Sequence, residues 1–126
     1  MKTVRVLVGM VVVALLVVVV DALSDATQNR PDAIVAGSRS TVVYDIELRD
    51  QRRNEAAAAA TLWSVCAGTV THATLRSGPA ASMAGWSVTV EPALGENSRR
   101  RLVGCLEDTT IDGVLARVVD LTPHPR

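Results

Sequence analysis

The N-terminal segment constrains this chain more than any other feature. An uncharged apolar run, VLVGMVVVALLVVVV, fills residues 6–20, with Lys2 and Arg5 before it and Asp21 after it. A positive start, an apolar middle and a polar exit are the charge layout of an export signal, in which the positive residues stay in the cytoplasm. A buried core helix would need a polar face toward solvent, which this run lacks. The sequence therefore predicts that the rest of the chain is extracytoplasmic.

Two fates of this segment stay open. As a signal peptide, it is removed after Ser24 or Ala26, where small residues stand at the cleavage positions, and the protein is secreted. As an anchor, residues 4–23 cross the cell membrane and hold the domain outside it. As a helix, the uncharged run alone is roughly 22 Å long, which is shorter than the ~30 Å hydrocarbon core of a bilayer. An anchor therefore also needs the flanking residues, and the Arg5 side chain must then snorkel to the membrane surface.

The charge balance and the remaining length bound what the chain does. Lys and Arg number 13, as do Asp and Glu, which excludes a strongly basic nucleic-acid-binding protein. After residues 1–24 and a polar linker over 25–40, one domain is expected at 41–122, followed by a tail at 123–126. A domain of about 80 residues without Phe has a small core, so a covalent crosslink would help to stabilise it.

The periodicity of the domain predicts an α+β fold. Residues 41–49 alternate apolar and polar side chains, as a half-buried strand does, and the alanine run at 56–60 favours a helix. The expected order is strand 41–49, helix 53–68, strand 69–76, turn 77–84, strand 86–91, helix 96–108 and strand 115–121. This βαββαβ order is typical of a ferredoxin-like two-layer sandwich, here preceded by a transmembrane or signal helix. Because each strand has one polar face, the helices are expected to cover only one side of the sheet.

Several local expectations accompany these elements. The first helix is capped by Asp50 or Asn54, and the second by Asn97 or Ser98. The inner stripe of the first helix contains Ala56, Ala59, Ala60, Trp63, Cys66 and Ala67. Trp63 and Trp86 are expected to pack on each other or on the sheet, rather than to stack on a ligand.

The two cysteines are predicted to form a disulfide. Export places Cys66 and Cys105 in an oxidising compartment, where a pair usually crosslinks. In the sandwich, both helices are expected to follow central parallel strands and to run the same way, so that two thiols near the helix ends meet. A redox-active pair would need C-x-x-C spacing, and a metal site would need His partners, so both are disfavoured.

The polar face of the sheet is the candidate interaction face. It is expected to carry Asp45, Glu47, Thr89, Glu91 and Arg117. Carboxylates that share a face are able to perform acid/base chemistry or to bind a cation. A solvated face with cross-strand ion pairs is the simpler interpretation, and a protein partner or a second copy of the chain could also cover it.

Other residues with chemical potential have structural interpretations. His72 is expected in the second strand, with no nucleophile that the sequence can pair with it, and His124 in the tail. The basic run Arg99–Arg101 is expected on a solvated helix face, although anionic lipid is an alternative contact. Phosphate-binding glycine loops, zinc-ligand spacings and nucleophile elbows are absent from the sequence, so no cofactor and no metal are expected.

Two motifs carry a family resemblance. The segments Leu62–Cys66 (LWSVC) and Leu102–Asp108 (LVGCLED), followed by Val114, resemble an uncharacterised group of small exported or membrane-anchored proteins of high-GC actinobacteria. The resemblance covers about residues 41–121. It implies an envelope location and a paired-cysteine domain, and it carries over no catalytic residue.

Three hypotheses for the function follow. The first is an extracytoplasmic interaction domain without catalysis, which contacts an unknown envelope protein through the open sheet face or a sheet edge, and for which homo-oligomerisation stays open. The second is an inhibitor or propeptide-like chaperone of an exported hydrolase. The third, an enzyme, requires that His72 and an acidic residue converge in a pocket.

Overall fold

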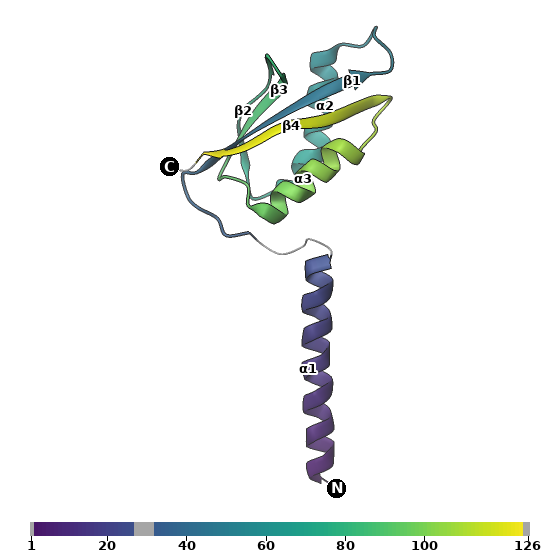
Figure 1. The fold of residues 1–126 in the computed structure, drawn as a ribbon, viewed down its shortest axis with the longest axis vertical. Coiled ribbons are helices and arrows are strands. Elements are labelled where there is room, and N and C mark those ends of the chain that lie inside the picture. The colour runs from purple at the N-terminus through teal and green to yellow at the C-terminus, as the bar shows by residue number, and fades with distance from the viewer. Residues whose placement is uncertain (1, 27–31, 125–126) are drawn as a thin grey trace. The chain divides into compact units, whose positions relative to one another are not determined.

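The computed structural model describes residues 2–26 and 32–124, and the chain forms two compact units over residues 1–30 and 31–126 (Figure 1). The first unit is the helix α1 (Lys2–Ala26). Its described large apolar side chains, from Val6 to Leu23, are exposed. No helix within the described residues combines the length and the apolarity that crossing a membrane requires.

The second unit is built on one antiparallel sheet. Its strands are β1 (Arg39–Leu48), β2 (Thr74–Ser82), β3 (Gly85–Glu91) and β4 (Val114–His124), arranged in the order β2-β3-β1-β4. Each neighbouring pair is antiparallel, including the central pair of β1 and β3. The predicted α+β class and the predicted order of strands and helices along the chain are confirmed.

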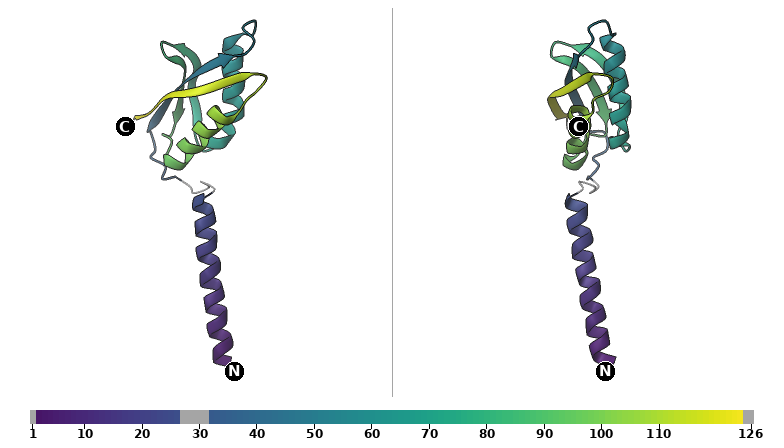
Figure 2. Two further views of the ribbon diagram at one scale, coloured as in Figure 1. Left: turned by 45° about the vertical axis from the view of Figure 1, so that its right-hand side comes forward. Right: turned by 90° about the vertical axis from the view of Figure 1, so that its right-hand side faces the viewer.

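Two helices complete this unit. They are α2 (Glu55–Cys66), which continues as the short 3-10 helix η1 (Ala67–Val70), and α3 (Glu96–Asp108), and Figure 2 shows α2 running along the sheet. Asn54 caps α2, since its Oδ1 accepts a hydrogen bond from the Ala57 N–H at 3.0 Å. The carboxylate of Asp50, the alternative cap, instead accepts a hydrogen bond from the Arg52 N–H.

The core lies between the two helices and one face of the sheet. Buried apolar residues from β1, β3, α2 and α3 belong to a single cluster. Tyr44 lies at its centre, where its ring stacks on Trp63 with the centroids 6.4 Å apart and its hydroxyl donates to the Ala59 carbonyl at 3.0 Å. Trp63 therefore packs on the sheet, whereas Trp86 is half-buried and donates its indole N–H to Glu55 Oε1 at 3.0 Å.

The second strand differs from its prediction. Residues 69 and 70 continue the helical segment as η1 because Val70 buries its side chain in the core and the Thr69 hydroxyl donates to the Cys66 carbonyl. β2 therefore starts at Thr74, and it runs through most of the predicted turn at 77–84. Gly78 permits this course: its φ is +99°, and a Cβ there would overlap the Ser87 carbonyl.

The predicted boundaries of the domain are too narrow. Ser38 and Ser40 are buried and accept hydrogen bonds from the Ala93 and Leu94 N–H groups at 3.0 and 2.9 Å. Residues 32–40, predicted as linker, thus belong to the folded unit, while predicted linker residues 27–31 lie outside the described residues. In the predicted tail, Pro123 and His124 pair with β1 as the end of β4.

The predicted disulfide between Cys66 and Cys105 is present, with an S–S distance of 2.04 Å and a Cα–Cα distance of 5.6 Å. The expected parallel course of the helices is wrong, because the strands that precede them, β1 and β3, are antiparallel. The bridge instead joins the last residue of α2 to the second half of α3, the two helices that Figure 1 shows on the same side of the sheet.

Candidate interaction face

The sheet surface opposite the core, here called the open face, carries the five predicted residues. In β1, Asp45 lies between buried residues and points away from the helices, and it pairs with Arg117 of β4. Thr89 of β3 likewise lies between two buried valines. Since α2 and α3 pack on the other side, no element within residues 32–124 covers this face. The five residues are Asp45, Glu47, Thr89, Glu91 and Arg117.

One half of the open face combines acidic and apolar side chains. Asp45 and Glu47 are exposed, and Glu47 stands opposite Leu115, whose side chain is 45% exposed. Beyond Arg117 on the same strand, Val119 is the extra residue where the β1–β4 register shifts, and it is 51% exposed. Apolar side chains next to carboxylates are typical of a surface that contacts protein rather than only water.

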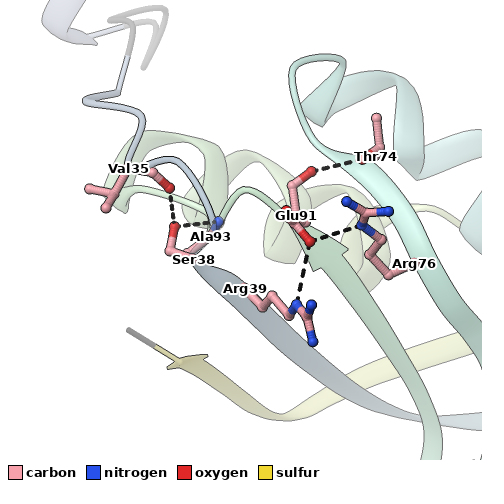
Figure 3. A network of polar contacts seen from close by, with 7 residues as sticks. All are labelled: Val35, Ser38, Arg39, Thr74, Arg76, Glu91 and Ala93. Atoms are coloured by element: carbon pink, nitrogen blue, oxygen red, sulfur yellow. Dashed lines mark hydrogen bonds and ion pairs between the residues drawn. The ribbon is translucent and has the colours of Figure 1, made fainter. Parts of the chain in front are cut away.

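Glu91 lies at the other end of the open face and holds two arginines (Figure 3). Its Oε2 is 2.9 Å from Arg76 Nε on β2 and 3.3 Å from Arg39 Nε on β1. The hydrogen bond from Arg76 is the main reason that the pKa of Glu91 lies below its ordinary value. Glu91 therefore joins three strands as an ion pair, as the simpler interpretation of this face predicted.

Both edges of the sheet resist the addition of another strand. On β4, the Val118 N–H donates to Glu107 Oε1 of α3 at 3.1 Å, so this edge group is occupied. On β2, Pro79 lacks an N–H, and the pairing register breaks on both sides of Ser77. Prolines, bulges and charged side chains at edges disfavour strand pairing between molecules. These features disfavour the addition of a strand at Val118 on β4 and around residues 77–79 on β2.

A polar cluster lies at the start of α3. His72 lies in the turn between η1 and β2, not in a strand, and its Nε2 is 3.3 Å from Ser98 Oγ. The carboxylate of Asp32 accepts hydrogen bonds from the N–H groups of Asn97 at 3.0 Å and Ser98 at 2.7 Å. Partial burial raises the pKa of Asp32, but the hydrogen bonds from Ser98 and Asn97 outweigh it, and the pKa lies below its ordinary value.

This cluster brings Asp, Ser and His together without forming a nucleophilic triad. A triad needs His between the acid and a nucleophile that reaches substrate. Here Ser98 lies between Asp32 and His72, and its side chain is fully buried. The cluster caps α3 instead, with Asp32 taking the role predicted for Asn97 or Ser98.

Gly95 explains why the cap comes from a distant residue. It occupies the N-cap position of α3, and a Cβ there would overlap the Asp32 side chain. The glycine thus leaves the space in which a carboxylate 65 residues earlier in the chain reaches the helix N-terminus. Sequence reasoning missed Asp32, because a cap is normally sought next to its helix.

The remaining candidates have structural roles. Arg99 and Arg100 form ion pairs with Glu96 at 3.3 and 3.0 Å, as expected of a solvated helix face. His124 Nε2 lies 3.2 Å from the Thr41 hydroxyl, across the β1–β4 pair.

Among the described residues, no group of three or more His, Cys, Asp or Glu side chains is arranged to hold a metal ion. Comparison with known proteins gives no matching family model, no matching curated protein and no matching solved structure.

Proposed function

We propose that this chain is an exported, non-catalytic interaction domain whose open face binds a protein partner of the cell envelope. The observation that carries the proposal is the open face itself. One side of the sheet supports the whole core, while the other presents exposed Leu115 opposite Glu47, the pair of Asp45 and Arg117, and exposed Val119 two residues further along β4. Exposed apolar side chains grouped with charges favour a surface that a partner covers.

Two further observations support export. The apolar side chains of α1 are exposed within their own unit. Insertion of the helix into a membrane, or its removal by cleavage, would take this apolar surface out of contact with water. The Cys66–Cys105 disulfide is typical of a protein that leaves the reducing cytoplasm. In this proposal, α1 is the export signal, and the envelope location agrees with the resemblance carried by the two cysteine motifs.

The proposal includes the finer fold class. The strand order β2-β3-β1-β4, with α2 and α3 on one side, supports a ferredoxin-like sandwich. Such a sandwich leaves one sheet face uncovered, which is the surface that the interaction would use.

A charge reversal on the open face tests the proposal. In cells that express the tagged full chain, Glu47→Arg is expected to abolish co-purification of a defined protein from the envelope fraction. Asp108→Arg is the matched control, because Asp108 is also exposed but belongs to α3, on the helical side. Equal recovery of the partner with both variants would overturn the assignment of the open face. If the co-purified partner is an exported hydrolase, the result would assign the inhibitor or propeptide-like role to this chain.

A further inference from the structure

A cavity separate from the open face lies between the first half of α2 and the turn that leads into β4. Its volume is about 250 Å³. The apolar part of its wall comes from α2 and from residues 111–114, and the charged part from Arg53 and Asp112. The apolar lining residues are Ala57, Ala58, Leu62, Ile111 and Val114.

The alanine run creates this space. The side chains of Ala57 and Ala58 end at Cβ. Where α2 faces Ile111 and Val114, the wall is therefore apolar, and the space in front of it is left open. Larger residues would pack into the same volume and would serve a helix equally well, since Leu has a helix propensity close to that of Ala. The cavity is therefore not required for the helix to form.

An ion pair lies at the charged wall of the cavity. Arg53 Nη2 is 3.5 Å from Asp112 Oδ2, and the two side chains are 43% and 71% exposed. Asp112 and Gly113 have φ values of 51° and 78°, and the Val114 N–H donates to the Ile111 carbonyl at 2.9 Å. These are the features of a tight two-residue turn, which fixes the backbone of Asp112. An exposed pair of this kind contributes little to folding, so its partners are free to exchange.

We propose that this cavity binds a free α-amino acid with a branched aliphatic side chain. An α-amino acid carries its ammonium and its carboxylate on one carbon, so only two adjacent groups of opposite charge match both at once. Arg53 would take the carboxylate, for which a guanidinium fork is well suited, and Asp112 would take the ammonium. The aliphatic side chain would then lie on Ala57, Ala58 and Leu62.

The size and the charges together favour this ligand class. A volume of about 250 Å³ is small for a drug-sized ligand but suits a molecule with few heavy atoms. An alkyl chain without charges would leave Arg53 and Asp112 paired only with each other and would gain nothing from either charge. A peptide chain end carries only one of the two charges at a given terminus, so it would match only half of the pair. Few ligand atoms limit the affinity, and a Kd of roughly 1 mM is expected for leucine.

Titration of the 15N-labelled full chain in detergent micelles tests the proposal by NMR. L-Leucine is expected to give saturable shifts in residues 53–62 and 111–114. Glycine, which lacks the side chain, 4-methylpentanoate, which lacks the ammonium, and 3-methylbutylamine, which lacks the carboxylate, are each expected to bind about tenfold more weakly or worse.

Three variants locate the site. Ala57→Leu fills the cavity and is expected to abolish the leucine shifts, whereas Ala60→Leu, on an exposed position outside the cavity lining, leaves them unchanged. Asp112→Asn keeps a residue that tolerates the turn and is expected to weaken binding about tenfold. The absence of saturable shifts, equal binding of 4-methylpentanoate, or unchanged binding by Ala57→Leu would each overturn the proposal.

Discussion

Removal of the disulfide is expected to destabilise the domain by a large part of its total stability. The variant Cys66→Ala/Cys105→Ala deletes the link between α2 and α3 without introducing a polar group. Cys66 is fully buried, so a serine there would add the desolvation of a hydroxyl to the measurement. Alanine at both positions therefore isolates the crosslink more cleanly.

The expected magnitude follows from the loop that the bridge closes. The cysteines are 39 residues apart, and the chain-entropy relation gives about 4 kcal/mol for a loop of this length at 25 °C. Small domains have unfolding free energies of roughly 5 to 15 kcal/mol, so this loss is a large part of the total. With urea m-values of about 1 to 3 kcal/mol/M, the urea midpoint is expected to fall by roughly 1 to 4 M.

Urea unfolding of the full chain, followed by tryptophan fluorescence in one detergent, measures this loss. Trp63 packs in the core and reports on the packing that the bridge holds. Reduction of the native chain is expected to reproduce the shift of the double variant, while reductant leaves the double variant itself unchanged. A loss below roughly 1 kcal/mol would refute the reasoning that the crosslink compensates for a small core.

Three further predictions concern the cap of α3 and the core. Asp32→Ala is expected to reduce the free energy of unfolding by about 1 kcal/mol in urea titrations. The folded-state pKa of Asp32 lies below its reference value of 3.8. The loss of unfolding free energy caused by Asp32→Ala is therefore expected in full above pH 3.8, and it is expected to disappear as the pH falls through the folded-state pKa. Gly95→Ala should lose a similar amount by displacing Asp32, so a double-mutant cycle that gives additive losses would contradict the shared cap. Tyr44→Phe removes the hydrogen bond to the Ala59 carbonyl and is expected to lose about 1 kcal/mol; a thermal unfolding midpoint equal to that of the native chain would count against it.

Much of the fold could be predicted because its signals are local. The alternation in β1 and the alanine run in α2 fix the type of each element through side-chain burial and backbone entropy. The order of the elements then restricts the sheet to few topologies. The pairing of the cysteines was predictable from their number and from the expectation of export, although the expected direction of the helices was wrong.

The missed features depend on contacts between distant parts of the chain. Asp32 caps a helix 65 residues later because Gly95 leaves space for it, and no sequence spacing predicts such a contact. The course of β2 through residues 77–82 likewise depends on the approach of Gly78 to β3. Glycines and prolines in this segment are local signals of a turn, which pairing with β3 overrides.

The open face was predictable because a period of two assigns each strand residue to a side of the sheet. Its five residues were identified from alternation alone, but the partners of Glu91 were not. Arg39 lies outside the predicted strand, and the register that brings Arg76 to Glu91 depends on the irregular pairing of β2 with β3.

Site-specific photocrosslinking in intact cells tests whether the open face contacts an envelope protein. A photoreactive phenylalanine analogue replaces Leu115 on the open face or, as the control, Val65 on α2, which is 52% exposed and similarly apolar. An adduct of one defined mass with an envelope protein is expected from position 115 and none from position 65. Adducts from position 65 alone, or the absence of any adduct from position 115, would contradict it.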